Sequence, residues 1–205
     1  MARMRIARRH SGKREGRRLP ESSPDRQVIA SILSRIDALN RMVQDLLVFS
    51  QPRDLRLQRV RLHAIVHDAA TMMARDPELA ASTVSLEGDD QEILADPELL
   101  RSVFLNLLMN AAQAMGEGSN TVRTEHASDQ AVVRVSDAGT GIAPDVIGHV
   151  FEPFFTTKHR GTGLGLAIAR RVVEAHGGEI QIASPRGQGT TVTVSFPASQ
   201  DRRPG

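Results

Sequence analysis

The spacing of apolar residues predicts a long helix near the start of the chain. Six apolar residues recur there at alternating intervals of three and four: Ile29, Ile32, Ile36, Leu39, Val43 and Leu46. This is a heptad pattern, and further apolar residues beside it widen the stripe beyond a two-stranded seam. Ser23 and Pro24 suit the start of the helix and Pro52 its end. We therefore expect a bundle-type helix within 23–52 that needs partner helices.

Shorter patterns divide the rest of the chain into strands and three more helices. Strands are expected at 55–62, 83–87, 91–95, 120–126, 131–139, 179–184 and 190–197. Helices are expected at 62–75, from Pro97 (with Asp96 as N-cap) to about 115, and from 164 to an end on Gly177. Residues 143–163 are irregular and rich in Gly, Pro and Phe. Because helices and strands do not strictly alternate, we expect an α/β protein of the α+β type, with helices on one face of a mixed sheet.

Composition narrows the classes of protein that this chain can represent. It has 205 residues, 40% of them hydrophobic, which suffices for one domain with appendages. It contains no cysteine, which excludes disulfides and thiolate metal sites. No apolar run approaches the roughly 18 residues that a membrane span requires. We therefore predict no transmembrane segment in this chain and a cytoplasmic location.

The basic residues are concentrated at the N-terminus. The formal net charge is only +2, yet residues 1–20 contain eight Lys and Arg against one Glu. We interpret residues 1–22 as a disordered basic tail. The chain has six Phe and neither Trp nor Tyr, so it is poorly supplied with side chains on which bases stack. We expect no nucleic-acid partner.

Two asparagines lie four residues apart in the apolar stretch "NLLMNAAQAM". This spacing places Asn106 and Asn110 on the same face of the expected helix. A buried amide needs hydrogen-bond partners. Either the two amides satisfy each other and nearby backbone, or they face a cavity in which a polar ligand binds.

The stretch "GTGLGLAI" combines a glycine-rich turn with the start of a helix. Gly161, Gly163 and Gly165 let backbone amides approach a ligand, and the helix start adds unpaired N–H groups and a positive dipole end. Lys158 would add positive charge nearby. These features suit a polyphosphate. Their order fits neither a dinucleotide-binding fold nor a P-loop.

Asp137 stands at the end of an expected strand, before two glycines. It is either an ordinary turn residue or a carboxylate that accepts a hydrogen bond from the exocyclic amine of adenine. With adenine bound there, Asn106 and Asn110 would supply neutral oxygens to magnesium in a metal–triphosphate.

His63 and His67 have the helical spacing of two zinc ligands. No Glu follows His63, and no third ligand is evident nearby. We interpret both as ordinary surface histidines of a helix.

The order of these motifs resembles the catalytic ATP-binding domain of sensor histidine kinases, within the gyrase–Hsp90–kinase–MutL superfamily. "NLLMNAAQAM" resembles the N box, "DAGTGI" the first glycine box, "FEPFFTTK" the F box and "GTGLGLAI" the second glycine box. "GQGTTVTVSFP" resembles the last glycine motif and its strand. The resemblance implies that residues 58–199 form a two-layer sandwich with a lid over ATP. "RIDALNRMVQDLLVFSQP" is similar to the second helix of the dimerisation hairpin in kinases of the nitrogen-regulation type.

The resemblance also implies roles for individual residues. Asn106 and Asn110 would hold magnesium and phosphate oxygens. Asp137 would bind the adenine amine, with Thr190 joining through water. The adenine pocket would be shaped by Gly139 and Gly141. The lid and phosphate cradle would comprise Lys158, Gly161, Thr162, Gly163, Leu164 and Gly165. The lid would be anchored on the body or the helical stalk by Phe151, Phe154 and Phe155.

The implied activity is transfer of the γ-phosphoryl group of ATP to a histidine, with signalling to the receiver domain of a response regulator. The acceptor motif of the family resembles H-E-[IL]-[RK]-N-P-L, and His10 in "ARRHSGKREG" does not match it. We therefore identify no catalytic residue and expect no autophosphorylation of this chain alone. We also expect a weak homodimer or pairing with an intact kinase. The alternatives are a remnant that binds ATP without phosphorylating itself and a kinase of the anti-sigma-factor type.

Overall fold

The computed structural model describes residues 28–29, 54–76, 79, 82–115, 119–127, 129–158 and 161–198. Its strands are β1 (Gln58–Arg61), β2 (Thr83–Gly88), β3 (Glu92–Ala95), β4 (Ser119–Ala127), β5 (Gln130–Asp137), β6 (Glu179–Ala183) and β7 (Thr190–Pro197). Its helices are α2 (Leu62–Met73), α3 (Pro97–Met115), α4 (Gly165–Ala175) and the short 3₁₀ helix η1 (Ile147–His149). Residues 28–29 are helical. The basic tail 1–22 and the rest of the predicted helix 23–52 lie outside the described residues.

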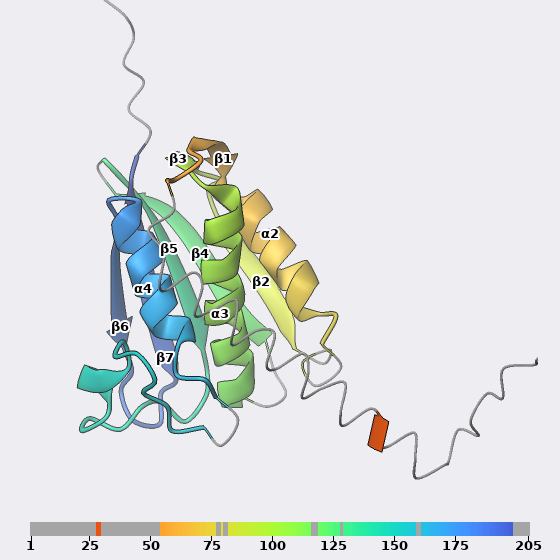
Figure 1. Ribbon diagram of the computed structural model, residues 1–205, viewed down its shortest axis with the longest axis vertical. Helices are drawn as coiled ribbons and strands as arrows, with labels where there is room; N and C mark the ends of the chain where they lie inside the picture. Colours follow the sequence, from red (N-terminus) through yellow and green to blue (C-terminus); the bar gives the residue numbers. More distant parts are fainter. Residues whose placement is uncertain are drawn as a thin grey trace, which may run out of the picture. The chain divides into compact units, whose positions relative to one another are not determined.

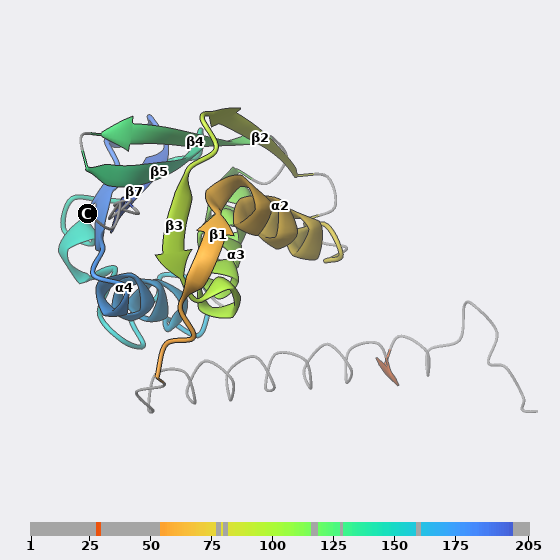
Figure 2. The same ribbon diagram turned by 90° about the horizontal axis from the view of Figure 1, so that it is seen from above.

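The described part of 54–198 forms two layers. One layer is a five-stranded sheet in the order β2-β4-β5-β7-β6, in which β2 pairs with β4 in parallel and the other neighbours are antiparallel. The other layer consists of α2, α3 and α4, all on one face of this sheet (Figures 1 and 2). A second, two-stranded sheet pairs β1 with β3. The prediction of a mixed sheet with helices on one face is confirmed.

The core lies between the two layers because each element presents apolar residues with its own period. Helix α3 buries seven side chains at helical spacing: Leu100, Val103, Phe104, Leu107, Leu108, Ala111 and Ala112. The central strand β5 buries Val133 and Val135 against them, and its neighbour β7 buries Val194 and Phe196. This packing fixes α3 across the middle of the sheet.

Asp96 caps helix α3 in the way that the sequence predicts. Its Oδ1 accepts hydrogen bonds from the backbone N–H groups of Glu98, at 3.1 Å, and Leu99, at 3.3 Å. Its Oδ2 accepts from the N–H of Arg56 at 3.1 Å, across 40 residues of sequence. One buried carboxylate therefore satisfies three backbone donors and connects the segment before β1, at Arg56, to the start of α3.

The backbone of Asp96 also joins α3 to the end of α4. Its N–H donates to Nε2 of His176 at 3.0 Å, and Nδ1 of His176 lies 2.7 Å from the carbonyl oxygen of Val172. A carbonyl only accepts, so Nδ1 carries the hydrogen and Nε2 is the acceptor. The start of α3 is thus clipped to the end of α4.

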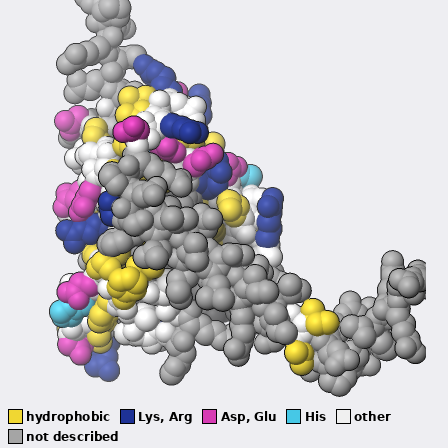
Figure 3. All heavy atoms as spheres, in the orientation of Figure 1, with side chains coloured by type: hydrophobic (Ala, Val, Ile, Leu, Met, Phe, Trp, Pro, Cys, Tyr) yellow, Lys and Arg dark blue, Asp and Glu magenta, His cyan; other side chains and the backbone are white. Residues whose placement is uncertain are grey.

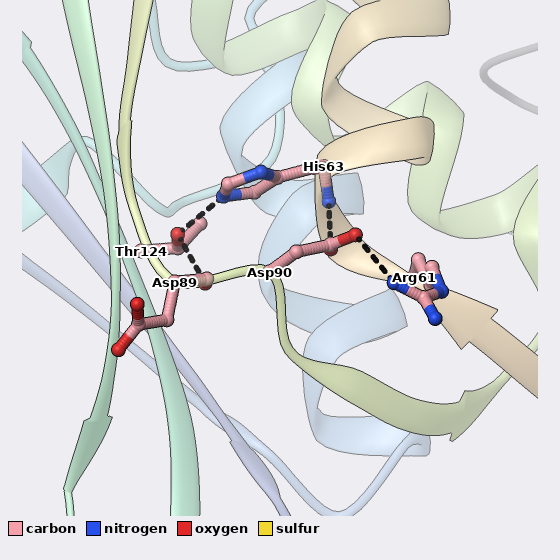
Figure 4. Close-up of polar contacts among 5 residues, drawn as sticks. All are labelled: Arg61, His63, Asp89, Asp90 and Thr124. Atoms are coloured by element: carbon pink, nitrogen blue, oxygen red, sulfur yellow. Dashed lines mark hydrogen bonds and ion pairs between the residues drawn. The ribbon is translucent and has the colours of Figure 1, made fainter.

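The start of α2 docks onto the turn between β2 and β3 (Figure 4). Asp90 accepts from the N–H of His63 at 3.1 Å through Oδ1 and pairs with Arg61 at 3.4 Å through Oδ2. Nε2 of His63 lies 2.7 Å from the hydroxyl oxygen of Thr124, which itself donates to the carbonyl of Asp89 at 2.8 Å. His63 therefore donates to Thr124 and ties α2 to β4.

This contact corrects one expectation. His67 is exposed, as predicted, but His63 is half-buried because the turn after β2 brings Thr124 within reach of its ring. Among the described residues, no group of three or more His, Asp and Glu side chains is arranged to hold a metal ion. Within the same residues, no helix has both the length and the apolar character needed to cross a bilayer.

We predict that Asp96→Ala lowers the free energy of unfolding by about 2 kcal/mol, because it leaves three backbone donors of α3 and the segment before β1 without their acceptor. Chemical denaturation of the full chain measures this change. Asp68→Ala is the matched control: its exposed carboxylate pairs with Arg101 at 3.7 Å, and its loss should cost less than about 0.5 kcal/mol. Equal effects for the two variants would contradict the capping role.

Candidate functional site

The residues singled out in the sequence come together at one end of the two-layer domain. The C-terminal half of α3, the end of β5, the start of β7 and the start of α4 meet there, at the lower end of the domain in Figure 1. The antiparallel pairing of β5 with β7 places Asp137 opposite Thr190. The segment between β5 and α4 lies at the same end. Motifs up to 84 residues apart are thereby brought into one region.

Asp137 holds the ends of two strands together. Its Oδ1 accepts hydrogen bonds from the N–H of Gly139 at 2.8 Å and from the N–H of Thr190 at 3.2 Å. The side chain is half-buried, and no described residue donates to its Oδ2. Oδ1 of Asp137 therefore stabilises the turn, and Oδ2 is available to accept a hydrogen bond from a ligand.

Glycine is required where these strands meet. Gly189 has a φ of +78°, and a Cβ at this position would lie 1.9 Å from the carbonyl oxygen of Asp137. In the loop after β5, a Cβ at Gly139 would lie 2.8 Å from the carbonyl of Ala114 at the end of α3. Bare backbone therefore lines this part of the site, because side chains would push the three segments apart.

A pocket of about 470 Å³ opens beside this loop. It lies between the end of α3 at Ala114 and Met115, residues 138–140, and residues 186–187 in the turn between β6 and β7. Asp137 precedes the lining segment directly. Space for a ligand is thus present beside the loop that follows Asp137, although Asp137 itself does not line the pocket.

Ser184 is a site residue that the sequence patterns did not single out. It follows β6 directly, and its hydroxyl accepts from the N–H of Ile142 at 2.7 Å and donates to the carbonyl of Gly189 at 3.0 Å. The same oxygen lies 2.9 Å from Oγ1 of Thr190. The only hint in the sequence is a serine placed before the proline that opens a glycine-containing turn. Ser184 connects the loop after β5 to the start of β7.

The two asparagines do not hydrogen-bond to each other. Nδ2 of Asn106 donates to the carbonyl of Gly165 at 3.4 Å. Oδ1 of Asn110 accepts from the ammonium of Lys158 at 2.9 Å, and the same ammonium donates to Oε1 of Gln113 at 2.7 Å. Both asparagines are half-buried. Asn106 therefore has a backbone partner, as in the first of the two possibilities that the sequence left open, whereas Asn110 contacts a cationic side chain.

Lys158 connects the two halves of the site electrostatically. Burial of its ammonium lowers the pKa of Lys158 below its usual value, because the charged form loses hydration. The carboxylate of Asp137 opposes this by raising the pKa, as expected for an opposite charge nearby. Its ammonium therefore contacts the amide oxygens of α3 and also interacts with the charge at the end of β5.

The start of α4 lacks a side-chain cap. The N–H of Leu164 donates to the hydroxyl of Thr162 at 3.3 Å, and the side chain of Leu164 is buried in the core. No side chain caps the helix from position 164, and the N–H groups of Gly165, Leu166 and Ala167 precede the first acceptor of the helix and have no partner within it. The N–H of Gly161 donates to the carbonyl of Lys158 at 3.3 Å. An uncapped helix start is suited to bind an anion.

The segment before α4 is closed into a loop by Phe154 and Gly163. The N–H of Phe154 donates to the carbonyl of Gly163 at 2.9 Å. Phe154 has a φ of +67°, which is rare for a residue with a side chain, and Gly163 has a φ of +68°. A Cβ at Gly163 would lie 2.4 Å from the carbonyl carbon of Phe154. This close approach requires glycine.

The aromatic residues of this segment have different environments. Phe151 packs against the core, and the guanidinium carbon of Arg170 lies 5.7 Å from the centre of its ring. Phe154 is 65% exposed, and hydrophobic side chains gather around the junction of this segment with α4 in Figure 3. Phe151 therefore attaches the segment to the body, whereas Phe154 does not.

The comparisons agree with this geometry. The family described as histidine kinase-, DNA gyrase B- and HSP90-like ATPase matches residues 95–200, just over half of the chain, and the chain belongs to this family. The sensor histidine kinase ZraS of Escherichia coli K12 is 37% identical over 189 residues, covering 91% of this chain and 41% of ZraS. The histidine-protein kinase AtoS of the same strain is 39% identical, covering 83% of this chain and 29% of AtoS. The chain thus spans about two fifths or less of these relatives.

Solved structures resemble the chain in the same way. Full-length ShkA, determined in complex with AMPPNP, superposes with a TM-score of 0.73 at 26% identity, covering 88% of this chain and 40% of ShkA. The histidine kinase ThkA, determined in complex with the response regulator TrrA, superposes with a TM-score of 0.70 at 25% identity, covering 90% of this chain and 55% of that one.

We predict that Gly163→Ala opens the loop between Phe154 and Gly163, because both the positive φ and the close approach of the two backbones exclude a Cβ. Hydrogen exchange should become faster in this segment and stay unchanged in β5 and α3. Gly148→Ala is the matched control, because a Cβ there meets no atom within 4 Å. Unchanged exchange in Gly163→Ala would show that the contact does not hold the loop.

Proposed function

We propose that this chain is the ATP-binding catalytic module of a two-component sensor histidine kinase, which transfers the γ-phosphoryl group of ATP to a histidine and signals to a response regulator. The observation that carries this proposal is the contact between the ammonium of Lys158 and the side-chain amides of α3. The ammonium of Lys158 bonds to Asn110 while Asn106 contacts the uncapped start of α4. A site for a cation and a site for an anion would therefore lie side by side.

Magnesium fits this arrangement. Oδ1 of Asn110 already accepts from a cation, and Asn106 uses only its Nδ2 in the contact with Gly165. Amide oxygens are ligands that magnesium accepts alongside phosphates and water. Asn106 and Asn110 would hold the ion. When bound, magnesium neutralises part of the charge of the triphosphate.

The phosphates would lie at the start of α4, where Gly161, Thr162, Gly163 and Gly165 keep the backbone accessible. Lys158 would add a positive charge, and Leu164 would support the turn from the core. Phosphoryl transfer depends mainly on positioning and on charge stabilisation. These residues would bind and orient the triphosphate, and the acceptor histidine would be presented to it.

The adenine base would bind at the end of β5. Oδ2 of Asp137 would accept a hydrogen bond from the exocyclic amine, since Oδ1 is already committed to the backbone. Thr190 would join the same network, and Gly139 and Gly141 would shape the pocket. The AMPPNP complex of the similar ShkA structure supports a nucleotide in this fold.

The partner would be the receiver domain of a response regulator, which the ThkA–TrrA complex of a similar kinase supports. A second candidate is a remnant that binds ATP and pairs weakly with itself or with an intact kinase. The lack of a match to the acceptor-histidine motif in the sequence favours testing this alternative directly. The two candidates differ in phosphoryl transfer and agree in nucleotide binding.

We predict that Asp137→Asn weakens ATP binding by about 10- to 100-fold, because an amide in place of the carboxylate loses a charge-assisted hydrogen bond and presents a donor to the amine. Calorimetric titration with ATP and magnesium measures the change. Asp145→Asn is the matched control, because Asp145 is an exposed residue in the segment between β5 and α4. If Asp137→Asn binds ATP as tightly as the parent does, the assignment of Asp137 as the residue that binds adenine is wrong.

We predict that the full chain transfers phosphate from γ-labelled ATP to an acceptor hairpin of a related kinase that is supplied separately, in a magnesium-dependent reaction. Asn110→Ala should lower the rate at least about tenfold, because it removes one oxygen from the cation site. Acid-labile, base-stable label on the hairpin, followed by its movement to a receiver domain, is the measurement. ATP binding without any transfer would favour the non-catalytic remnant.

A further inference from the structure

The hydroxyl group of Ser184 has three neighbours, and their chemistry determines the direction of every hydrogen bond. A hydroxyl has one hydrogen to donate and two lone pairs that accept. The carbonyl of Gly189, at 3.0 Å, only accepts, so the hydrogen of Ser184 is directed to it. The N–H of Ile142, at 2.7 Å, only donates, so it occupies one lone pair. One lone pair of Ser184 is left.

Thr190 takes this remaining position. Its Oγ1 lies 2.9 Å from Oγ of Ser184, and Ser184 has no second hydrogen to give. The hydroxyl of Thr190 must therefore donate to Ser184. Its own lone pairs stay available as acceptors, and the hydrogen cannot turn toward a ligand without breaking the bond to Ser184.

The backbone of Thr190 brings this acceptor close to a second one. The N–H of Thr190 donates to Oδ1 of Asp137, and Asp137 and Thr190 are directly paired between β5 and β7. Oδ2 of Asp137 can only accept while it is ionised. The end of the strand pair therefore offers two acceptors and no side-chain donor from these two residues.

We infer that Ser184 is a positioning residue for nucleobase selection: by holding the hydroxyl of Thr190 as an acceptor, it makes the site select a purine with a 6-amino group over one with a 6-oxo group. This inference rests on the proposed function, in which Asp137 and Thr190 face the base.

A carboxylate alone would not make this distinction well. Adenine presents an amino group at position 6, whereas 6-oxopurines present a carbonyl oxygen there. A 6-oxopurine also has an N1–H donor, with which Asp137 could bond. A second acceptor, fixed at Thr190, would accept a hydrogen bond from the 6-amino group of adenine. It would repel the carbonyl oxygen of a 6-oxopurine. When a 6-oxopurine binds, the acceptor at Thr190 stays without a donor, and this loss increases the selectivity for the 6-aminopurine.

The test compares ATP with inosine triphosphate, which carries a 6-oxo group, by calorimetric titration of the full chain in the presence of magnesium. The parent should prefer ATP. Ser184→Ala frees the hydroxyl of Thr190 to donate, and the preference for ATP should fall about tenfold. Because the measured quantity is a ratio within each variant, a partial loss of folded protein does not change it.

A double-mutant cycle separates positioning from general structural support. Thr190→Val should reduce the preference by a similar factor, and Ser184→Ala should cause no further loss in the Thr190→Val background. Ser136→Ala is the matched control: Ser136 forms the same kind of hydroxyl pair with Thr191, at 2.9 Å, on the adjacent residue pair of β5 and β7. Its preference for ATP should equal that of the parent.

If Ser184→Ala prefers ATP over inosine triphosphate as strongly as the parent does, the inference is overturned and the proposed function stays intact. Equal losses in Ser136→Ala would also overturn it, because the effect would then be general to the sheet. Failure of the parent to bind either nucleotide would overturn both the proposed function and the inference.

Discussion

One carboxylate oxygen holds the end of β5 to the start of β7, and the candidate site depends on this contact. Oδ1 of Asp137 accepts two backbone hydrogen bonds, so the side chain has little freedom to rotate. The direction of Oδ2 is consequently set by the main chain of the sheet. Gly189 makes this possible because its backbone passes within contact of the Asp137 carbonyl. A ligand would meet a group already oriented for it, which reduces the cost of binding.

The cation contact at α3 has a related property. Asn110 and Gln113 are neutral, so their oxygens solvate the ammonium of Lys158 without forming ion pairs. When Lys158 moves away, no buried charge is left without a partner, as it would be had carboxylates stood at these positions. Neutral oxygens thus allow one cation to replace another at low cost. Asparagines, and not acidic residues, would therefore suit the proposed site, where a metal–nucleotide would be loaded and released.

Local patterns predicted most of the fold. The N-cap at Asp96 and the start of α4 after a glycine-rich turn each depend on neighbours within a few residues, and the structure agrees with them. Strand β5 forms where the sequence predicts it, but residues 131–133 are all buried, so its burial does not alternate there. The contacts that sequence reasoning missed join distant segments. Ser184 meets Ile142 across 42 residues, and His63 meets Thr124 across 61. A small polar residue carries no periodic signal for such a contact, because its partner is determined only when the sheet and helices pack.

The clip between Asp96 and His176 lies at the end of the α3–α4 pair that is remote from the site. The two helices are antiparallel, so the contact between Asp96 and His176 joins them at one end, and the contact between Asn106 and Gly165 joins them at the end that carries the candidate ligand groups. Helix α4, with 11 residues, is about 16 Å long. A rotation of about 5° around the clip would therefore move Gly165 by roughly 1.4 Å relative to Asn106. Displacements of about 1 Å are enough to slow a positioned reaction greatly. The hydrogen bond between Asp96 and His176, at the far end of α4, is therefore one of the contacts that fix the distance between Gly165 and Asn106.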